Sequence, residues 1–121
     1  LKVAGAFHTE YMKSAQAPLA EMAAGLEVHD PRISILSNRD GRAVESGREY
    51  VDALVSQVTN PVRWDLCQAT LVEAGVTGLI ELAPGGTLTG LAKRAMKGVE
   101  TLAVKSAEDL EGAREFVRTH A

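Results

Sequence analysis

The first quarter of the chain reads as a short strand followed by an amphipathic helix. Residues 1–7 (LKVAGAF) are apolar and partly β-prone, which predicts a strand that ends just before His8. Thr9 can cap a helix over residues 10–24, in which Pro18 should start or kink a segment and Gly25 should end it. Apolar side chains spaced three and four apart predict one buried stripe: Met12, Ala15, Leu19, Met22 and Leu26.

The middle of the chain predicts a small hairpin and then two helices. Residues 33–37 (ISILS) resemble a strand, and a turn over 38–41 lets Val44 close the hairpin. Ser46 with Glu49 forms a capping box for a helix that ends near Thr59. Its apolar row is Tyr50, Leu54 and Val58.

Asn60-Pro61 reads as a cap followed by proline at the first helical position, which predicts a second helix up to Gly75. The apolar face of this helix is Trp64, Cys67, Leu71 and Ala74. Residues 76–82 and 101–104 are expected strands, separated by a helix that Thr87 caps and Gly98 ends. Ser106 with Asp109 opens the last helix.

Alternating apolar strands and helices predict an α/β fold with a mainly parallel sheet. Three or four strands are few for such a sheet, so we expect more strands upstream. The chain also begins with Leu1 rather than Met, inside an expected strand. It is therefore expected to be part of a longer protein.

Composition narrows the function further. The 121 residues carry 13 Lys and Arg against 16 Asp and Glu, a net charge of -3, which disfavours nucleic acid and anionic membranes as partners. No apolar run approaches the length of a membrane span, so a cytoplasmic protein is expected. The single cysteine, Cys67, fits a reducing compartment and is expected to be a small buried side chain.

Most chemistry-bearing motifs are missing or incomplete. The stretch 84–90 contains G-x-x-x-x-G but has Leu91-Ala92 where a phosphate loop has Lys-Ser/Thr, so it reads as a glycine turn. No serine lies in a G-x-S-x-G context, and the spacing of the three histidines predicts no metal site. His8 stands out because ligands gather at strand ends in α/β sheets, although a lone histidine there is more often a packing residue.

Three blocks of sequence resemble one family. AGAFHT (residues 4–9), QVTNPVRW (57–64) and ELAPGGTLTGL (81–91) are similar, in order and spacing, to the C-terminal part of malonyl-CoA:acyl carrier protein transacylases. The resemblance extends over the whole chain. It implies that residues 1–121 are the C-terminal portion of an acyltransferase domain with a hydrolase-like core, whose N-terminal half and ferredoxin-like insert lie upstream.

The resemblance also implies a reaction. A serine in a G-H-S-x-G elbow takes malonyl from malonyl-CoA, and the pantetheine thiol of acyl carrier protein then removes it, as in fatty acid biosynthesis. His8 matches the general base, and Gln57 matches the position whose carbonyl orients that histidine. The family implies malonyl-CoA as substrate without a bound cofactor, and a monomer when complete.

Phe7 matches the A-F-H form that accompanies malonyl rather than methylmalonyl selection in related polyketide acyltransferases. A phenyl ring beside the acyl α-carbon leaves little room for a branch methyl, which is worth about 1 to 3 kcal/mol. Without the family resemblance, Phe7 reads equally well as a core residue.

Two alternatives remain open. The serine, the carboxylate-binding arginine and the oxyanion donors are not in this sequence, so the chain alone is expected to be inactive. It could instead be a non-catalytic module that binds acidic acyl carrier protein through Lys93, Arg94 and Lys97, which also read as a solvated helix end. A polyketide synthase acyltransferase domain is the other alternative, whereas an unrelated hydrolase is disfavoured because no acid partner precedes His8.

Overall fold

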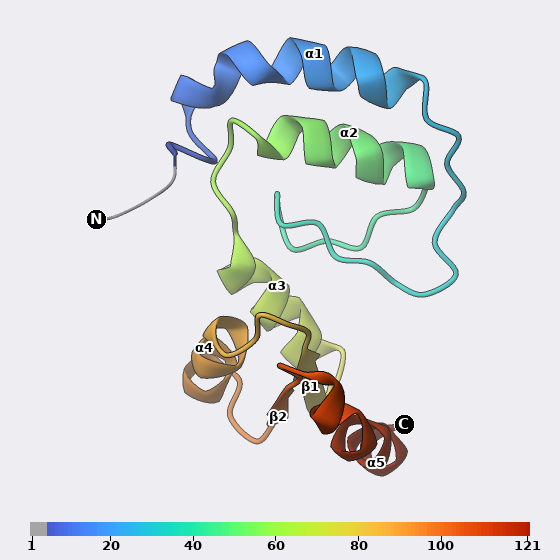
Figure 1. The fold of residues 1–121 in the computed structure, drawn as a ribbon, viewed down its shortest axis with the longest axis vertical. Helices are drawn as coiled ribbons and strands as arrows, with labels where there is room; N and C mark the ends of the chain where they lie inside the picture. Colours follow the sequence, from blue (N-terminus) through green and yellow to red (C-terminus); the bar gives the residue numbers. More distant parts are fainter. Residues whose placement is uncertain (1–4) are drawn as a thin grey trace. The chain divides into compact units, whose positions relative to one another are not determined.

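The computed structural model describes residues 5–121, which divide into two compact units between Cys67 and Gln68. The first unit is helical with an irregular segment, and the second is built on a small parallel sheet (Figure 1). This confirms the mixed α/β class. Among the described residues, no helix is both long enough and apolar enough to cross a membrane.

Two helices, α1 (Lys13–Ala24) and α2 (Gly47–Gln57), lie side by side in the first unit (Figure 1). The short 3-10 helix η1 (Glu10–Met12) precedes α1. Pro18 lies inside α1 and does not start a helix, and Gly25 caps its end as predicted. The guanidinium of Arg48 on α2 donates to the carbonyl of Ala23 at the end of α1 (3.1 Å), which also accepts from Leu26 N–H (3.2 Å).

The described residues of this unit contain no extended strand, although two were predicted. Residues 1–4 of the first predicted strand lie outside the described residues, and residues 5–7 form a bend and a turn. Residues 33–37 contribute only an isolated antiparallel bridge, Leu36 with Ala43, so the prediction of a strand there is wrong. The hairpin survives in minimal form, since Ser37 N–H donates to Arg42 O (2.8 Å) and Val44 N–H to Ile35 O (3.0 Å).

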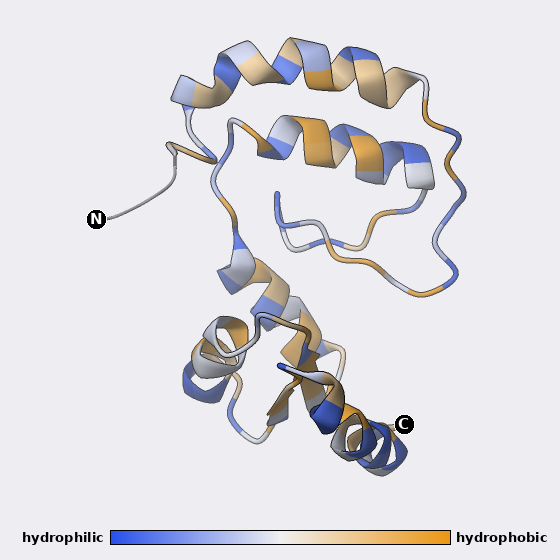
Figure 2. Cartoon of the chain, in the orientation of Figure 1, coloured by the Kyte–Doolittle hydropathy of each residue, from blue (hydrophilic) through white to orange (hydrophobic). Residues whose placement is uncertain are grey.

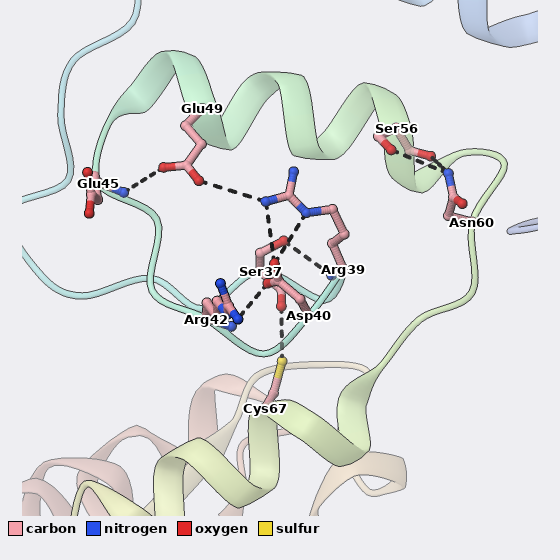
Figure 3. A network of polar contacts seen from close by, with 9 residues as sticks. All are labelled: Ser37, Arg39, Asp40, Arg42, Glu45, Glu49, Ser56, Asn60 and Cys67. Carbon is pink, nitrogen blue, oxygen red and sulfur yellow. Dashed lines mark hydrogen bonds and ion pairs between the residues drawn. The ribbon is translucent and has the colours of Figure 1, made fainter.

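A polar network joins the hairpin to α2 in place of a longer strand ladder (Figure 3). Arg39 contacts the carboxylates of Asp40 (3.5 Å) and Glu49 (3.8 Å). Glu49 also accepts from the backbone N–H of Glu45 (2.8 Å), and its own N–H donates to Ser46 Oγ (3.1 Å). Ser46 is therefore the N-cap of α2 as predicted, but the carboxylate reaches one residue further back than in a capping box.

The helix after Asn60-Pro61 starts later than predicted. The helix α3 spans Trp64–Glu73, so Pro61 is not at its first position. Asn60 is engaged elsewhere, because its side chain donates to the carbonyl of Ser56 (2.8 Å) at the end of α2. Gly75 follows α3 with a φ of +75°, and Val76 N–H donates to Leu71 O (3.1 Å), a Schellman-type ending that only glycine adopts without strain.

The second unit is a parallel strand–helix–strand motif with one further helix. The strands β1 (Gly78–Glu81) and β2 (Glu100–Ala103) pair in parallel register and are connected by α4 (Thr87–Ala95). Next come η2 (Ala107–Asp109) and α5 (Leu110–His120), which packs on β1. The predicted capping box between Ser106 and Asp109 is present, whereas the predicted cap Thr87 is the first helical residue and Gly86 is the N-cap.

The apolar stripe predicted to be buried on α1 is largely accessible. Met22 is 71% exposed and Leu26 is 54% exposed, and the buried residue of α1 is Ala23. Hydrophobic residues are concentrated instead on β1 and β2 and on the middle of α2 (Figure 2). The prediction of burial failed because the pattern shows which helix face is apolar but not how much protein covers that face.

The start of α2 requires a glycine. A Cβ at Gly47 would overlap the backbone carbonyl of His29, which the neighbouring chain cannot easily move, and Gly47 N–H donates to Asp30 Oδ1 (3.0 Å). We expect Gly47→Ala to lower the free energy of unfolding by about 1–3 kcal/mol, measured by urea denaturation. The matched control is Gly112→Ala in α5, where the space around a Cβ is open and alanine should stabilise by about 0.5–1 kcal/mol. An unchanged urea midpoint for Gly47→Ala would contradict the close packing.

Candidate functional site

His8 lies in a tight turn rather than at the end of a strand. Its φ is +62°, in the left-handed region that few non-glycine residues adopt and that is concentrated at functional sites. The hydroxyl of Thr9 closes the turn by donating to the carbonyl of Ala6 (2.6 Å), and it does not cap the following helix. The imidazole is exposed on the described part of the chain.

The ring of His8 is oriented by α2. Its Nδ1 lies 2.8 Å from the backbone carbonyl oxygen of Gln57. A carbonyl oxygen can only accept a hydrogen bond, so Nδ1 must carry the proton for this bond to form. In the neutral ring, Nε2 then keeps its lone pair and is available to accept a proton.

Gln57 contributes through its backbone and its side chain in different directions. It is the last residue of α2, where carbonyl groups have no partner within the helix. Its carbonyl accepts from Asn60 N–H (3.2 Å) as well as from His8. Its side-chain Nε2 donates to the carbonyls of Asn60 (2.8 Å) and Pro61 (2.9 Å). The structure therefore brings His8 and Gln57 together, and it adds Asn60, which the sequence analysis treated only as a cap.

An apolar groove of about 530 Å³ begins at this pair and runs between α1 and α2. The aromatic ring of Phe7 lies at the same end and is 59% exposed, so it is not a core residue of the described structure. The remaining wall is formed by the apolar side chains of both helices, including Met12, Leu19 and Leu54. The arrangement places a proton acceptor at the end of an apolar wall.

The glycine turn at 84–90 is occupied from within. The carboxylate of Glu81, at the end of β1, accepts from the backbone N–H groups of Gly86 (2.7 Å), Leu88 (2.9 Å) and Thr89 (2.8 Å). These are the N–H groups that a phosphate would use at a helix N-terminus. Because Glu81 already fills this position, the loop is a structural turn and not an anion site.

Burial disfavours the charged form of Glu81, but the hydrogen bonds from Thr89, Leu88 and Gly86 outweigh burial and lower the pKa of Glu81 to about 2. The sequence analysis included Glu81 in a motif without assigning it a role. The signal in the sequence was an acidic residue at the end of an expected strand, separated by three residues from the glycines at the start of the next helix.

Other candidate groups do not form a site in the described residues. Cys67 is 1% exposed and its thiol contacts Ser37 O (3.5 Å) and Asn38 Oδ1 (3.4 Å). Burial raises the pKa of this thiol, and the charges of Asp40 and Asp65 raise it further, which disfavours a reactive thiolate. Over residues 5–121 no cluster of His, Cys, Asp or Glu is placed to hold a metal ion.

The basic residues Lys93, Arg94 and Lys97 are exposed at and just after the end of α4. The side chain of Arg94 donates back to the carbonyl of Gly90 (3.2 Å). This placement fits favourable charge at a helix C-terminus, and it leaves the cluster on the surface of the second unit.

Comparison with known proteins identifies relatives whose sequences are similar over most of this chain. No family model matches the chain. A protein of Mycobacterium tuberculosis named malonyl CoA-acyl carrier protein transacylase is 54% identical over 111 residues, which is 92% of this chain and 37% of the relative. The chain thus spans little more than a third of the length of such curated relatives.

Solved structures show the same fold. The crystal structure of MCAT from Mycobacterium tuberculosis matches with a TM-score of 0.87 and 54% identity, over 93% of this chain and 37% of that protein. A malonyl-transacylase in complex with a type II PKS acyl-carrier protein matches with a TM-score of 0.87 and 36% identity, over 95% of this chain and 37% of the other. The resemblance found in the sequence is therefore confirmed, and the fold is that of the C-terminal portion of these proteins.

The buried carboxylate of Glu81 predicts a pH-dependent stability. Its folded-state pKa of about 2 lies below the ordinary value of 4.5, so its stabilising contribution is complete above pH 4.5 and is lost as the pH falls towards 2. We expect Glu81→Gln to lower the urea midpoint at pH 7, and the difference from wild type to shrink between pH 4.5 and 2. Glu108→Gln, at an exposed carboxylate, is the control and should change little. A difference for Glu81→Gln that is constant across this range would show that the charge is not what stabilises α4.

Proposed function

We propose that this chain, whose sequence and fold correspond to the C-terminal portion of malonyl CoA-acyl carrier protein transacylases, takes part in malonyl transfer from malonyl-CoA to acyl carrier protein in fatty acid biosynthesis. Residues 1–121 form the C-terminal portion of the acyltransferase domain, and His8 is the general base. No bound cofactor is needed for this reaction.

The observation that carries the proposal is the 2.8 Å contact between His8 Nδ1 and the Gln57 carbonyl. It supports a ring whose Nε2 accepts the proton of a serine hydroxyl while the serine oxygen attacks the malonyl thioester carbonyl. The protonated ring then returns this proton to the sulfur of the departing coenzyme A. In the second half-reaction the pantetheine thiol gives its proton to Nε2, its sulfur attacks the seryl ester, and the serine oxygen leaves and regains the proton.

The nucleophile has to come from outside these residues. None of the six serines in the sequence lies in a G-x-S-x-G context, and the two at positions 46 and 106 precede helices as N-caps. By analogy with the relatives, a further segment supplies the serine, the arginine for the malonyl carboxylate and the oxyanion donors. Residues 1–121 alone should therefore not turn over.

A second candidate function is supported by the basic residues at and just after the end of α4. A solved relative is bound to an acyl-carrier protein, and such carriers are acidic, so Lys93, Arg94 and Lys97 offer complementary charge. A purely binding module would keep its affinity for the carrier after His8→Ala. The two candidates differ in malonyl transfer, which only the transferase would lose with His8→Ala.

The decisive test joins the N-terminal portion of the Mycobacterium tuberculosis relative, up to the residue aligned with Leu1, to residues 1–121. We expect this chimera to transfer malonyl to acyl carrier protein, and His8→Ala to reduce kcat/KM by about 10²–10⁴-fold because the base is lost. His29→Ala, at another exposed histidine of the same unit, is the matched control and should retain activity. The proposal is wrong if His8→Ala is as active as the parent chimera. Turnover by residues 1–121 alone that disappears in His8→Ala would refute the need for an upstream serine.

Phe7 is proposed to select the acyl group by its bulk beside His8. In the active chimera, Phe7→Ser should lower the preference for malonyl over methylmalonyl by about tenfold or more, because space for one methyl group is created. The ratio of the two kcat/KM values measures this change. Tyr11→Ser provides the control, since Tyr11 is an exposed aromatic residue nearby that does not line the groove. An unchanged ratio for Phe7→Ser would exclude the steric explanation.

A further inference from the structure

We infer that the side-chain amide of Gln57 is a positioning group for His8: it fixes the turn after α2 so that the Gln57 carbonyl holds His8 with its proton on Nδ1. The inference rests on the proposed function for its catalytic consequence, because only a base needs a free Nε2. The contacts on which it is based all lie among the described residues.

The acceptor of this hydrogen bond is a group that the end of a helix leaves unpaired. Gln57 is the last residue of α2, so no backbone N–H four residues further on forms the usual helical hydrogen bond to its carbonyl oxygen. Two donors converge on it instead, His8 Nδ1 at 2.8 Å and Asn60 N–H at 3.2 Å. The direction of the carbonyl therefore depends on the path of the chain from residue 57 to 61.

The side chain of Gln57 fixes this path. Its amide nitrogen has two protons, and both are used, one on the carbonyl of Asn60 (2.8 Å) and one on the carbonyl of Pro61 (2.9 Å). A contact in the opposite direction completes the clamp, because Asn60 Nδ2 donates to the carbonyl of Ser56 (2.8 Å), as Figure 3 shows. The turn is thus tied to the last residues of α2 from both sides.

The clamp matters because His8 and its acceptor lie at the surface. Water competes for both nitrogens of an exposed imidazole. In addition, the turn after α2 loses conformational entropy when it is held in one orientation. A pre-oriented carbonyl lowers this cost for the Nδ1–H tautomer. Without the clamp, the carbonyl can turn to water and the ring can carry its proton on Nε2, which then has no lone pair to accept a proton from a serine.

The test measures the tautomer of neutral His8 by ¹⁵N NMR in the 121-residue chain, in alkaline buffer. Gln57→Met keeps the side-chain length and the backbone carbonyl but removes both donors. We expect the ratio of the Nδ1–H to the Nε2–H form to fall about three- to tenfold, the loss expected for one hydrogen bond. Gln57→Lys, which restores a donor of similar reach, should recover part of the ratio.

Gln16→Met is the matched control: the amide of Gln16 on α1 donates to the carbonyl of Val55 on α2 (3.5 Å), and although Gln16 lines a hollow with Thr59 and Asn60, it has no hydrogen bond to His8 or to the turn among the described residues. It should leave the ratio unchanged, and backbone chemical shifts of α1 and α2 should show that all variants remain folded. An equal effect of Gln16→Met and Gln57→Met would mean general loosening of the unit and would overturn the inference.

Two further outcomes separate this inference from the proposed function. If Nδ1–H predominates in wild type and Gln57→Met does not change it, the clamp is wrong while the role of His8 as base stands. If Nε2–H predominates in wild type, the hydrogen bond to Gln57 is absent and the clamp falls with it. Retained malonyl transfer by the His8→Ala chimera would refute the base without affecting the NMR result.

Discussion

The hydrogen bond from His8 to the carbonyl of Gln57 is the constraint on which the site depends, and it joins positions 49 residues apart. It can form only if α2 ends at Gln57 and lies where the turn at His8 can reach it. Arg48 ties α2 to the end of α1, and Gly47 allows its start to pack against the backbone of His29. The orientation of one imidazole is thus a consequence of how a whole helix is placed.

The unpaired backbone groups at helix ends are used in different ways in the two units. Every helix end leaves backbone groups without partners. At the start of α4 these groups are satisfied internally by Glu81, which closes a loop whose sequence resembles an anion site. At the end of α2 the carbonyl of Gln57 accepts from a distant side chain and gives it a fixed tautomer. A motif therefore indicates a binding site only when its backbone groups are not already paired within the fold.

Local signals in the sequence were sufficient to find the helices and the two strands of the second unit, predicted at 76–82 and 101–104, but insufficient for residues 33–37. Ser46 and Ser106 cap their helices through residues three positions away, which a pattern of spacing can reveal. A strand needs a partner from elsewhere in the chain, so residues 33–37 could not be assigned from their apolar character alone. Asn60 was misjudged because its side chain can serve the helix before it as well as the helix after it. The pairing of His8 with Gln57 came from the family resemblance, since no spacing rule connects them.

The orientation of His8 is physically separable from the supply of a nucleophile. Every described contact that fixes the ring, from the turn at Thr9 to the clamp at Asn60 and Pro61, lies within the first unit. The chain spans 37% of its relative's length, and yet the acceptor, the tautomer and the groove beside them are all built from its own residues. Under the proposed function, His8 is a base whose orientation is set within one unit and which needs only to meet a serine at Nε2. The rest of the site then has to supply the position of that serine and no further adjustment of the imidazole.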